Sequence, residues 1–585
     1  MSRIATHAIV RTFVLVGLVF VGKVEAVVDP AQVRAHLPAF EQYVTQSQAR
    51  TGVPGLSIAV VSGDQVVYLQ GFGVRQIGQA ATVTPDTVFQ LASLSKPVSS
   101  TVVAGLVGRG AVGWDARIAK LIPGFRMSSP DTTARVTVRE MLSHQSGLPE
   151  YAGDVLVDVG FNRHELMRRT RYITLEAPLG MHYAYSNVGY TIGAAAAARP
   201  TGIGWEDVAK AILYRPLNMR STSSRYIDFI NARNRAEPHV RSGSTWVPRV
   251  PPNDDEAESP AGGVSSSARD MANFLRLHLR NGRFDGRPVI APRALIETRT
   301  PQVSTGSGYY GLGWNVSTDA AGRLRLNHSG AFNSGAATVI TYYPNEDVGI
   351  VVLSNSYPIG LPEAIAEGFF DLLYNGAVQH DYVTLFGEYF AGFWQGIIDL
   401  YPTYPPPPTP AQPARPLASY VGTYASDLYG SAEVVRTAQG LAIQLGPKRV
   451  TYPLRHYNGD LFLFTPVGEN AYVPSGAHFG FAGRGAARTL LIDYYNTEGK
   501  GTLVRAGASP VVREDLKVTP QNQNARRLFG RAGFPTNRLQ NVFGRSRLAG
   551  VWAVAEQLPR ARTFFAAHSL ARRVAVSLTA RVRSS

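Results

Sequence analysis

The sequence predicts a mixed α/β domain that is followed by a small all-β domain. Two observations lead to this fold class. Strand-like hairpins stand at both ends of one long region with helix-compatible segments between them, and a proline-dense segment separates that region from a series of short β-type runs. The chain has 585 residues, which is too long for one hydrophobic core, so two or three folding units are expected.

The first domain is expected to begin and end with strand pairs. Residues 56–61 and 66–69 are rich in β-branched residues and are separated by a Ser-Gly-Asp turn, which predicts a hairpin. Residues 338–343 and 348–353 flank a Pro-Asn-Glu-Asp turn and predict a second hairpin, which the apolar, helix-like segment 362–374 follows. Strands at both ends with helices between them favour one mixed α/β domain.

A helix is expected to start close to Ser93. Residues 93–110 are helix-compatible, but Pro97 is tolerated only in a first turn. At the far end of this segment, Gly108 to Gly113 fit the G-x-G-x-x-G pattern of dinucleotide sites. Because they follow a helix-like run rather than a strand, they predict a helix end and a turn.

The second domain follows a stiff linker. Residues 401–413 are dense in proline and should be extended. Beyond them, short β-type runs alternate with Gly, Asn and Asp turns at the spacing of a small barrel or sandwich. We therefore predict a first, mixed α/β domain over 27–376, a helical and proline-rich linker over 377–417, and an all-β accessory domain over 418–507.

The two ends of the chain are predicted to be an export signal and a basic tail. Residues 1–26 combine two arginines, an apolar run of about ten residues and a Val-Glu-Ala cleavage site, which predicts a signal peptide and a periplasmic or extracellular protein. A membrane anchor is the alternative, but the run is too short to span a bilayer. Residues 508–585 are arginine-rich and predicted to be disordered, either as a solvated extension or as a contact to anionic envelope surfaces.

Composition excludes several classes of function. The net charge is +16, but from residue 509 onward about fourteen basic side chains face three acidic ones, so the rest is only mildly basic and nucleic acid is not an expected partner. The chain has no cysteine, and His164-Glu165 lacks the second histidine of an H-E-x-x-H site. No cofactor and no metal are therefore expected.

The segment Ser93-Leu-Ser-Lys96 is the strongest chemical signal. An offset of three residues at a helix start places the serine hydroxyl and the lysine amine on one face. A serine needs a base to become a nucleophile, and a desolvated lysine can act as that base whereas an arginine cannot. Only about seven of the 58 basic residues are lysines, so a lysine at this position stands out.

Two later motifs supply possible partners. Tyr185-Ser-Asn187 offers a phenol that nearby cations could turn into a base, and an amide that could hold substrate or lysine. His328-Ser-Gly330 precedes a predicted strand, where a glycine lets backbone approach a substrate closely. Taken alone, Tyr185 could equally be a buried ring and His328 a structural histidine.

The order Ser-x-x-Lys, Tyr-x-Asn, His-x-Gly resembles the class C β-lactamase family and its relatives, the D-aminopeptidases, DD-peptidases and penicillin-binding-type esterases. The resemblance runs from about residue 53 to residue 374. It implies a β-lactamase/transpeptidase-like fold, with an antiparallel sheet flanked by helices and an all-helical part. It is supported by four further phrases: Met141 to Leu148, Ser259 to Val264, Ser267 to Met271, and Tyr310 to Trp314.

The resemblance also implies roles for the site residues. Ser93 is similar to the acylated nucleophile, Lys96 to its activating amine and Tyr185 to the base, while Asn187 would organise the cleft. The remaining implied residues are His328, Ser329 and Gly330 for substrate binding, and the backbone N–H groups of Ser93 and Ala331 as the oxyanion hole.

One departure from the family pattern affects the expected substrate. Where β-lactamases and DD-peptidases usually have Lys-Thr-Gly, this chain has His328-Ser-Gly330, and a histidine is mostly neutral at pH 7. In the family the lysine helps bind a carboxylate. The sequence therefore predicts an exported serine hydrolase, an esterase or D-peptidase rather than an efficient β-lactamase, acting on a small-molecule or peptidoglycan-like substrate. The alternative is a non-catalytic cell-wall ligand sensor or penicillin-binding protein.

Overall fold

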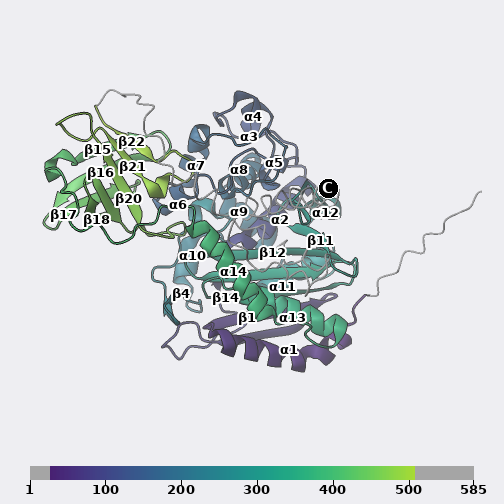
Figure 1. The fold of residues 1–585 in the computed structure, drawn as a ribbon. Coiled ribbons are helices and arrows are strands. Elements are labelled where there is room, and N and C mark those ends of the chain that lie inside the picture. The colour runs from purple at the N-terminus through teal and green to yellow at the C-terminus, as the bar shows by residue number, and fades with distance from the viewer. Residues whose placement is uncertain (1–26, 508–585) are drawn as a thin grey trace, which may run out of the picture.

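The computed structural model describes residues 27–507. The predicted signal peptide, 1–26, and the predicted basic tail, 508–585, lie outside the described residues. Figure 1 shows a body of sheet and helices with a small barrel at one end. The predicted fold class is therefore confirmed, including the all-β unit that follows the mixed domain.

An eight-stranded antiparallel sheet forms the centre of the first domain. Both predicted hairpins are present and lie side by side, because β1 pairs with β14 so that Leu56 is opposite Ser354. The strand order is β2-β1-β14-β13-β12-β11-β10-β9. The bounds are β1 Gly55–Ser62, β2 Gln65–Gly73, β9 Val303–Ser304, β10 Tyr309–Tyr310, β11 Asn315–Thr318, β12 Leu324–Phe332, β13 Ala336–Tyr343 and β14 Val348–Ser354.

Helices cover both faces of this sheet. α1 (Pro30–Thr51) and α13 (Leu361–Asn375) pack together on one face, and α11 (Ala268–Leu279) packs on the other. Every residue of β1, β13 and β14 is buried, which explains why these strands are continuous apolar runs rather than alternating ones. Asp29 caps α1 by accepting a hydrogen bond from Ala31, with Pro30 at the first position.

A helical part stands beside the sheet and carries the chemical motifs. Its central helices are α2 (Ser95–Gly108) and α8 (Asn187–Ala198), which pack on each other. Pro97 lies in the first turn of α2, as predicted, and Gly110 with φ +71° forms the expected turn after the helix. The other helices are η1 Ala92–Leu94, α3 Ile118–Leu121, α4 Pro130–Arg135, α5 Val138–Leu142, α6 Val155–Asp158, α7 Arg163–Arg169, η2 Thr170–Tyr172, η3 Arg199–Thr201, α9 Trp205–Ala209, η4 Lys210–Tyr214, α10 Tyr226–Asn231, η5 Glu256–Glu258 and α12 Pro292–Glu297.

The second unit is a closed antiparallel barrel. Aromatic rings fill it: Tyr420, for example, packs edge to face on Phe462 and Phe479 with centroids about 5 Å apart. Helix α14 (Tyr382–Ile398) and a proline-rich stretch join it to the first domain, and η6 (Leu417–Ser419) leads into it. The strands are β15 Gly422–Ser426, β16 Gly430–Thr437, β17 Gly440–Leu445, β18 Val450–Asn458, β19 Leu461–Phe464, β20 Ser475–Gly480, β21 Thr489–Ile492 and β22 Thr502–Arg505, with η7 Asp493–Tyr495 before β22.

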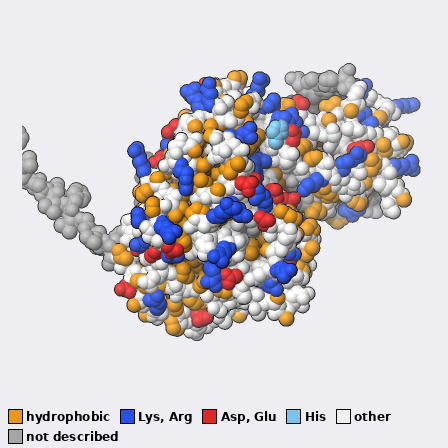
Figure 2. All heavy atoms as spheres, turned by 180° about the vertical axis from the view of Figure 1, so that it is seen from behind, with side chains coloured by type: hydrophobic (Ala, Val, Ile, Leu, Met, Phe, Trp, Pro, Cys, Tyr) orange, Lys and Arg blue, Asp and Glu red, His pale blue; other side chains and the backbone are white. Residues whose placement is uncertain are grey.

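Short two-stranded sheets complete the fold. They pair β3 with β6, β4 with β5 and β7 with β8. Over residues 27–507 no helix is both long and apolar enough to cross a membrane. On the face seen in Figure 2, basic and acidic side chains are interspersed rather than separated. The bounds of the six strands are β3 Phe89–Gln90, β4 His239–Ser242, β5 Thr245–Pro248, β6 Ser265–Ser266, β7 Arg283–Phe284 and β8 Arg287–Pro288.

Candidate active site

Ser93 lies at the turn that enters α2. It is the middle residue of η1 and is half-buried. The preceding residue, Ala92, has φ +48°, a left-handed conformation that is unfavourable for a residue with a Cβ, and it is fully buried. Strained backbone of this kind persists only where the surrounding packing fixes it, and it clusters at functional sites. The strain therefore marks the serine independently of its sequence motif.

Lys96 is buried beneath Ser93 and makes three polar contacts. Its Nζ lies 3.2 Å from Ser93 Oγ, 2.7 Å from Asn187 Oδ1 and 3.0 Å from the carbonyl oxygen of Ala261. Burial lowers the pKa of Lys96 to about 7, although the carboxyl groups of Glu258, Asp154 and Asp255 oppose this shift. An amine with this pKa is unprotonated in about half of the molecules at pH 7.

Tyr185 completes the group around the serine. Its hydroxyl lies 2.9 Å from Ser93 Oγ, and Lys96 Nζ lies 4.5 Å from the centre of its ring. Burial raises the pKa of Tyr185 far above its ordinary value. The sequence-based role of a phenolate base required nearby cations to lower this pKa, so the electrostatics point in the opposite direction. His144, from the Met141 to Leu148 phrase, packs on the same ring with centroids 4.4 Å apart.

Asn187 is held between a lysine and a carboxyl group. Its Oδ1 accepts from Lys96, and its Nδ2 donates to Asp154 Oδ2 at 2.7 Å. Because the lysine amine donates to one end of the amide and the Asp154 carboxyl oxygen accepts from the other, these two partners fix its orientation. Of the two roles left open by the sequence, the contacts match holding the lysine. Ser186 caps α8 through Gly189 N, which places Tyr185 and Asn187 at the helix start.

His328 is not among the described residues that border the cavity beside Ser93, and its predicted contact with substrate stays a prediction. The ring is fully buried, its Nδ1 hydrogen-bonds the carbonyl oxygen of Ser329 at 2.7 Å, and its Nε2 lies 3.1 Å from Tyr310 OH. A carbonyl can only accept, so Nδ1 carries the proton and Nε2 accepts from the tyrosine. Burial, assisted by the charge of Lys96, lowers the pKa of His328 to about 3. The alternative of a structural histidine fits these contacts.

The residues after His328 form the strand edge next to the nucleophile. Ser329 borders the cavity. A Cβ on Gly330 would collide with the carbonyl of Leu91, so the glycine permits β12 to approach η1 rather than a substrate. Ala331 follows and borders the same cavity as Ser93.

The cavity itself measures about 70 Å³, and several of its walls were not predicted from the sequence. The predicted residues that border it are Ser93, Tyr185, Asn187, Ser329 and Ala331. Those that sequence reasoning missed are Tyr151, Asp154, Val157, Asp255, Glu258, Gly262, Phe332, Phe390, Phe393, Trp394, Ile397, Glu469, Asn470 and Tyr472. One signal could have found part of this wall: the apolar residues of α14 recur at helical spacing.

The barrel contributes part of the wall through the loop between β19 and β20. Asp158 on α6 accepts hydrogen bonds from the backbone N–H of Glu469 at 2.9 Å and of Asn470 at 2.8 Å. The Glu469 carboxylate accepts in turn from Ser334 N at 3.1 Å and Ser334 Oγ at 2.7 Å, in the turn between β12 and β13. These four hydrogen bonds to two carboxyl groups tie the loop to the first domain.

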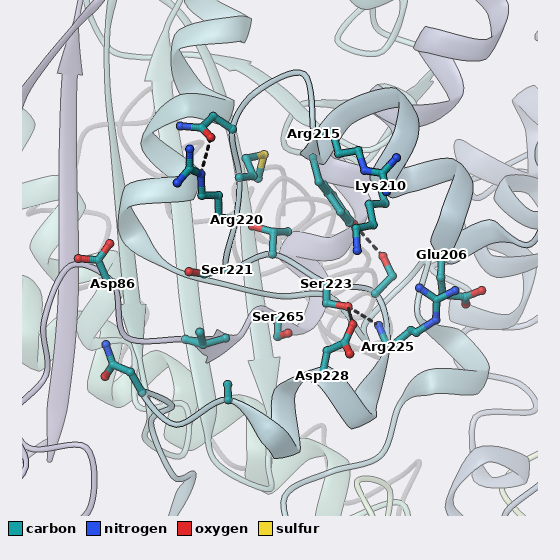
Figure 3. A pocket seen from close by; sticks show the side chains of 18 residues that line it. Asp86, Glu206, Lys210, Arg215, Arg220, Ser221, Ser223, Arg225, Asp228 and Ser265 are labelled. Carbon is teal, nitrogen blue, oxygen red and sulfur yellow. Dashed lines mark hydrogen bonds between the residues drawn. The ribbon is translucent and has the colours of Figure 1, made fainter.

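A larger cavity, of about 750 Å³, lies on another part of the first domain (Figure 3). Arg220 and Arg225 on its rim pair with Asn218 and Asp207. Ser223 Oγ donates to Asp228 Oδ2, so this serine faces a carboxylate rather than an amine. No nucleophile with a base is assembled there in the described part of the chain, which leaves the smaller cavity as the candidate active site. Nor do residues 27–507 contain a group of three His, Asp or Glu side chains that could hold a metal ion.

Comparisons with known proteins agree with this geometry. The family model described as beta-lactamase matches residues 40–367, and the model for a domain of unknown function (DUF3471) matches residues 406–502. The chain is 29% identical to penicillin-binding protein 4 of Amycolatopsis lactamdurans over 315 residues, covering 52% of this chain and 81% of that protein.

Two further proteins match more of the chain. It is 24% identical to unguisins hydrolase ungD of Aspergillus violaceofuscus over 534 residues, covering 81% of this chain and 91% of that one. Among solved structures, the octameric penicillin-binding protein homologue from Pyrococcus abyssi has a TM-score of 0.53 at 19% identity, covering 80% of this chain and 100% of that chain. At this identity the structural match shows the fold.

Proposed function

Because the chain belongs to the β-lactamase family, we propose that it is a serine hydrolase that cleaves ester or amide bonds through an acyl-enzyme on Ser93. One observation carries this proposal: Ser93 Oγ lies within hydrogen-bond distance of both Lys96 Nζ and Tyr185 OH. A nucleophile, a base and a proton donor are thus in one place, which is what acyl transfer requires. The relative that is named a hydrolase supports hydrolysis as the reaction class.

Lys96 is proposed as the group that activates the serine. In its unprotonated form the amine donates to Asn187 Oδ1 and the Ala261 carbonyl and directs its lone pair at Ser93 Oγ. The hydroxyl proton passes to Nζ as Oγ bonds to the substrate carbonyl carbon. This charges the amine next to the carboxyl groups of Asp154 and Glu258, which favour the protonated form.

Tyr185 is proposed as the proton donor to the leaving group, in place of the base role expected from the sequence. Burial keeps its phenol protonated. When the bond between the carbonyl carbon and the leaving oxygen or nitrogen breaks, the leaving atom takes a proton from the tyrosine, and Lys96 then gives the phenolate the proton that it took from Ser93. Water then attacks the acyl carbonyl carbon and gives one proton to Lys96, and Ser93 Oγ takes that proton as its ester bond breaks.

The oxyanion hole is proposed to be the backbone N–H groups of Ser93 and Ala331. Both residues border the cavity, one on η1 and one on β12, and Gly330 allows these two segments to approach. Fixed donors at such a position stabilise the charge that develops on the carbonyl oxygen, and loss of one donor costs on the order of a hundredfold in rate.

Ester or peptide hydrolysis is proposed in preference to efficient β-lactam hydrolysis. The support is that the family's lysine position holds His328, whose pKa is about 3, so the group there is neutral and buried. A substrate carboxylate would find no cation from this residue. Export, predicted from residues 1–26, remains part of the proposal and is tested by the N-terminal mass of the protein from fractionated cells.

The function is tested with an active-site label. A fluorophosphonate should label the wild type and leave Ser93→Ala unlabelled, while short-chain nitrophenyl esters are hydrolysed faster than a chromogenic cephalosporin. Equal labelling of the two proteins would refute the nucleophile. Fast cephalosporin turnover with no ester turnover would refute the substrate preference, and ligand binding without any turnover would favour the non-catalytic sensor.

A further inference from the structure

The wall of the active-site cavity carries acidic groups without basic ones. Four carboxyl side chains border the cavity, and no lysine, arginine or histidine is among the described residues that do so. The cation of Lys96 lies beneath the wall, where its three hydrogen bonds go to a serine, an amide and a carbonyl. The four carboxyl groups belong to Asp154, Asp255, Glu258 and Glu469.

Two of these carboxyl groups have an oxygen with no hydrogen-bond donor. Asp154 Oδ1 and Glu258 Oε1 are buried and unpartnered within the described chain, and the two side chains are only 4% and 6% exposed. The arginine next to this segment, Arg163, is already bound to Glu206 and Ser259. A buried acceptor without a donor is costly, so these two oxygens mark a place where a ligand with N–H groups would be stabilised.

The pKa values of these carboxyl groups also favour a cationic ligand. Burial raises the pKa of Asp154 to about 7 and that of Asp255 to about 8, and it raises the pKa of Glu258 well above its ordinary value. The neighbouring carboxyl groups add to each of these shifts. Near pH 7 these carboxyl groups are therefore at least partly protonated in the free protein, and a bound ammonium group would favour their ionised forms.

Aromatic rings stand around the same cavity. Tyr151 precedes α6, Phe393 and Trp394 project from α14, and Tyr472 comes from the barrel loop. Ring faces attract ammonium groups, and carboxylates beside aromatic rings are a recurring way to bind them. The rings also offer apolar surface to the rest of a substrate.

We propose that the cavity selects substrates that carry an ammonium group within one or two bonds of the scissile carbonyl, next to an apolar or aromatic side chain. The inference rests on the proposed hydrolysis at Ser93. The distance follows from the position of the carboxyl groups: Asp154 and Glu258 border the same cavity as Ser93, and the Asn187 amide bridges Asp154 to Lys96 beside the serine. α-Aminoacyl esters and amides fit this description, and substrates with a carboxylate at the same place do not.

Binding tests this proposal without depending on turnover. In the full chain with Ser93→Ala, isothermal titration should show phenylalaninamide binding at least tenfold more tightly than 3-phenylpropanamide, which lacks only the amine. Both enantiomers of the amide are titrated, since the charge argument does not depend on the configuration. Equal affinity of the charged and the neutral amide, or tighter binding of the neutral one, overturns the proposal.

A kinetic comparison separates this inference from the proposed function. The wild type should hydrolyse phenylalanine p-nitroanilide with at least tenfold higher kcat/KM than its 3-phenylpropionyl analogue. Glu258→Gln should reduce that ratio about tenfold, and Glu388→Gln, an exposed glutamate on α14, should leave it unchanged. If Ser93 reacts with the label but the ratio is near one, the selectivity is wrong and the hydrolase stands. If Ser93 does not react, the hydrolase is wrong, and the titration alone decides the selectivity.

Discussion

Replacing Lys96 by arginine isolates the one property that the proposed mechanism needs from this side chain. The substitution keeps a long cationic side chain in the space under Ser93, but a guanidinium cannot lose its proton in a protein. If the lysine only held Asn187 Oδ1 at 2.7 Å, an arginine could largely do the same. If the lysine accepts the serine proton, the arginine variant loses the first step of the reaction.

The expected loss follows from the pKa. A lysine at its ordinary pKa of 10.5 is unprotonated in about one molecule in three thousand at pH 7, whereas a pKa of about 7 makes about half of the amines available. Burial therefore raises the reactive fraction about a thousandfold. We expect Lys96→Arg to reduce kcat/KM for a nitrophenyl ester at least about a thousandfold, the upper part of the range for a lost general base.

The assay is the pH profile of kcat/KM from about pH 5 to about pH 9, which reports groups of the free enzyme. Below the pKa the amine is protonated and inactive, so the rate should rise through about pH 7 and then level off. Asp154 titrates in the same range, and the two groups are distinguished by temperature, because amines ionise with a large enthalpy and carboxyl groups with a small one. Lys210→Arg, at an exposed lysine of the larger cavity, is the matched control. A flat profile, or Lys96→Arg activity within tenfold of the wild type, would refute the reasoning.

Three further predictions test other parts of the site. Gly330→Ala should reduce the rate of ester hydrolysis about a hundredfold or more, because the new Cβ would push β12 away from η1. Gly113→Ala, where nothing lies within 4 Å of the new Cβ, should leave the rate unchanged. Similar rates for both variants would contradict this prediction. Asp158→Asn should raise KM about tenfold, because it weakens the hydrogen bonds from Glu469 N and Asn470 N. Circular dichroism should show that the barrel of this variant is still folded. An unchanged KM would show that the loop does not shape the site. Asp255→Asn should raise the melting temperature at pH 8 by about 2 °C or more and have less effect near pH 5. The folded pKa of Asp255, about 8, lies above its unfolded value of 3.8, so the native state binds the proton more tightly and stability is lost as the pH rises through this window; a larger gain at pH 5 than at pH 8 would contradict this sign.

The sequence predicted those parts of the fold that depend on the pattern of neighbouring residues. The hairpins follow from β-branched runs with turn residues between them, and the start of α2 follows from the position of Pro97. The contact between Ser93 and Lys96 follows from their offset in one turn. Tyr185 was predicted through its motif, but the effect of burial on its pKa depends on packing by distant segments and could not be inferred locally.

The residues that sequence reasoning missed come to the candidate site only through tertiary contacts. Asp154 lies 33 positions before Asn187 with no motif of its own, and Glu469 comes from a different domain. His328 is a motif residue whose ring hydrogen-bonds other residues of the fold. A family position usually held by a cation suggested contact with substrate, whereas an imidazole ring there is satisfied by Tyr310 and a backbone carbonyl.

The pairing of β1 with β14 has a consequence for how the molecule is made. These neighbouring strands are separated in sequence by almost the whole length of the first domain, and α1 packs on α13 in the same way. During synthesis the first hairpin therefore has an open edge and an uncovered apolar face until the last strand of the domain leaves the ribosome. Such distant pairings require a very long loop to close, at a cost in chain entropy, before any contact forms. Folding of the first domain should therefore be slow, and nascent chains should depend on chaperones that shield that edge.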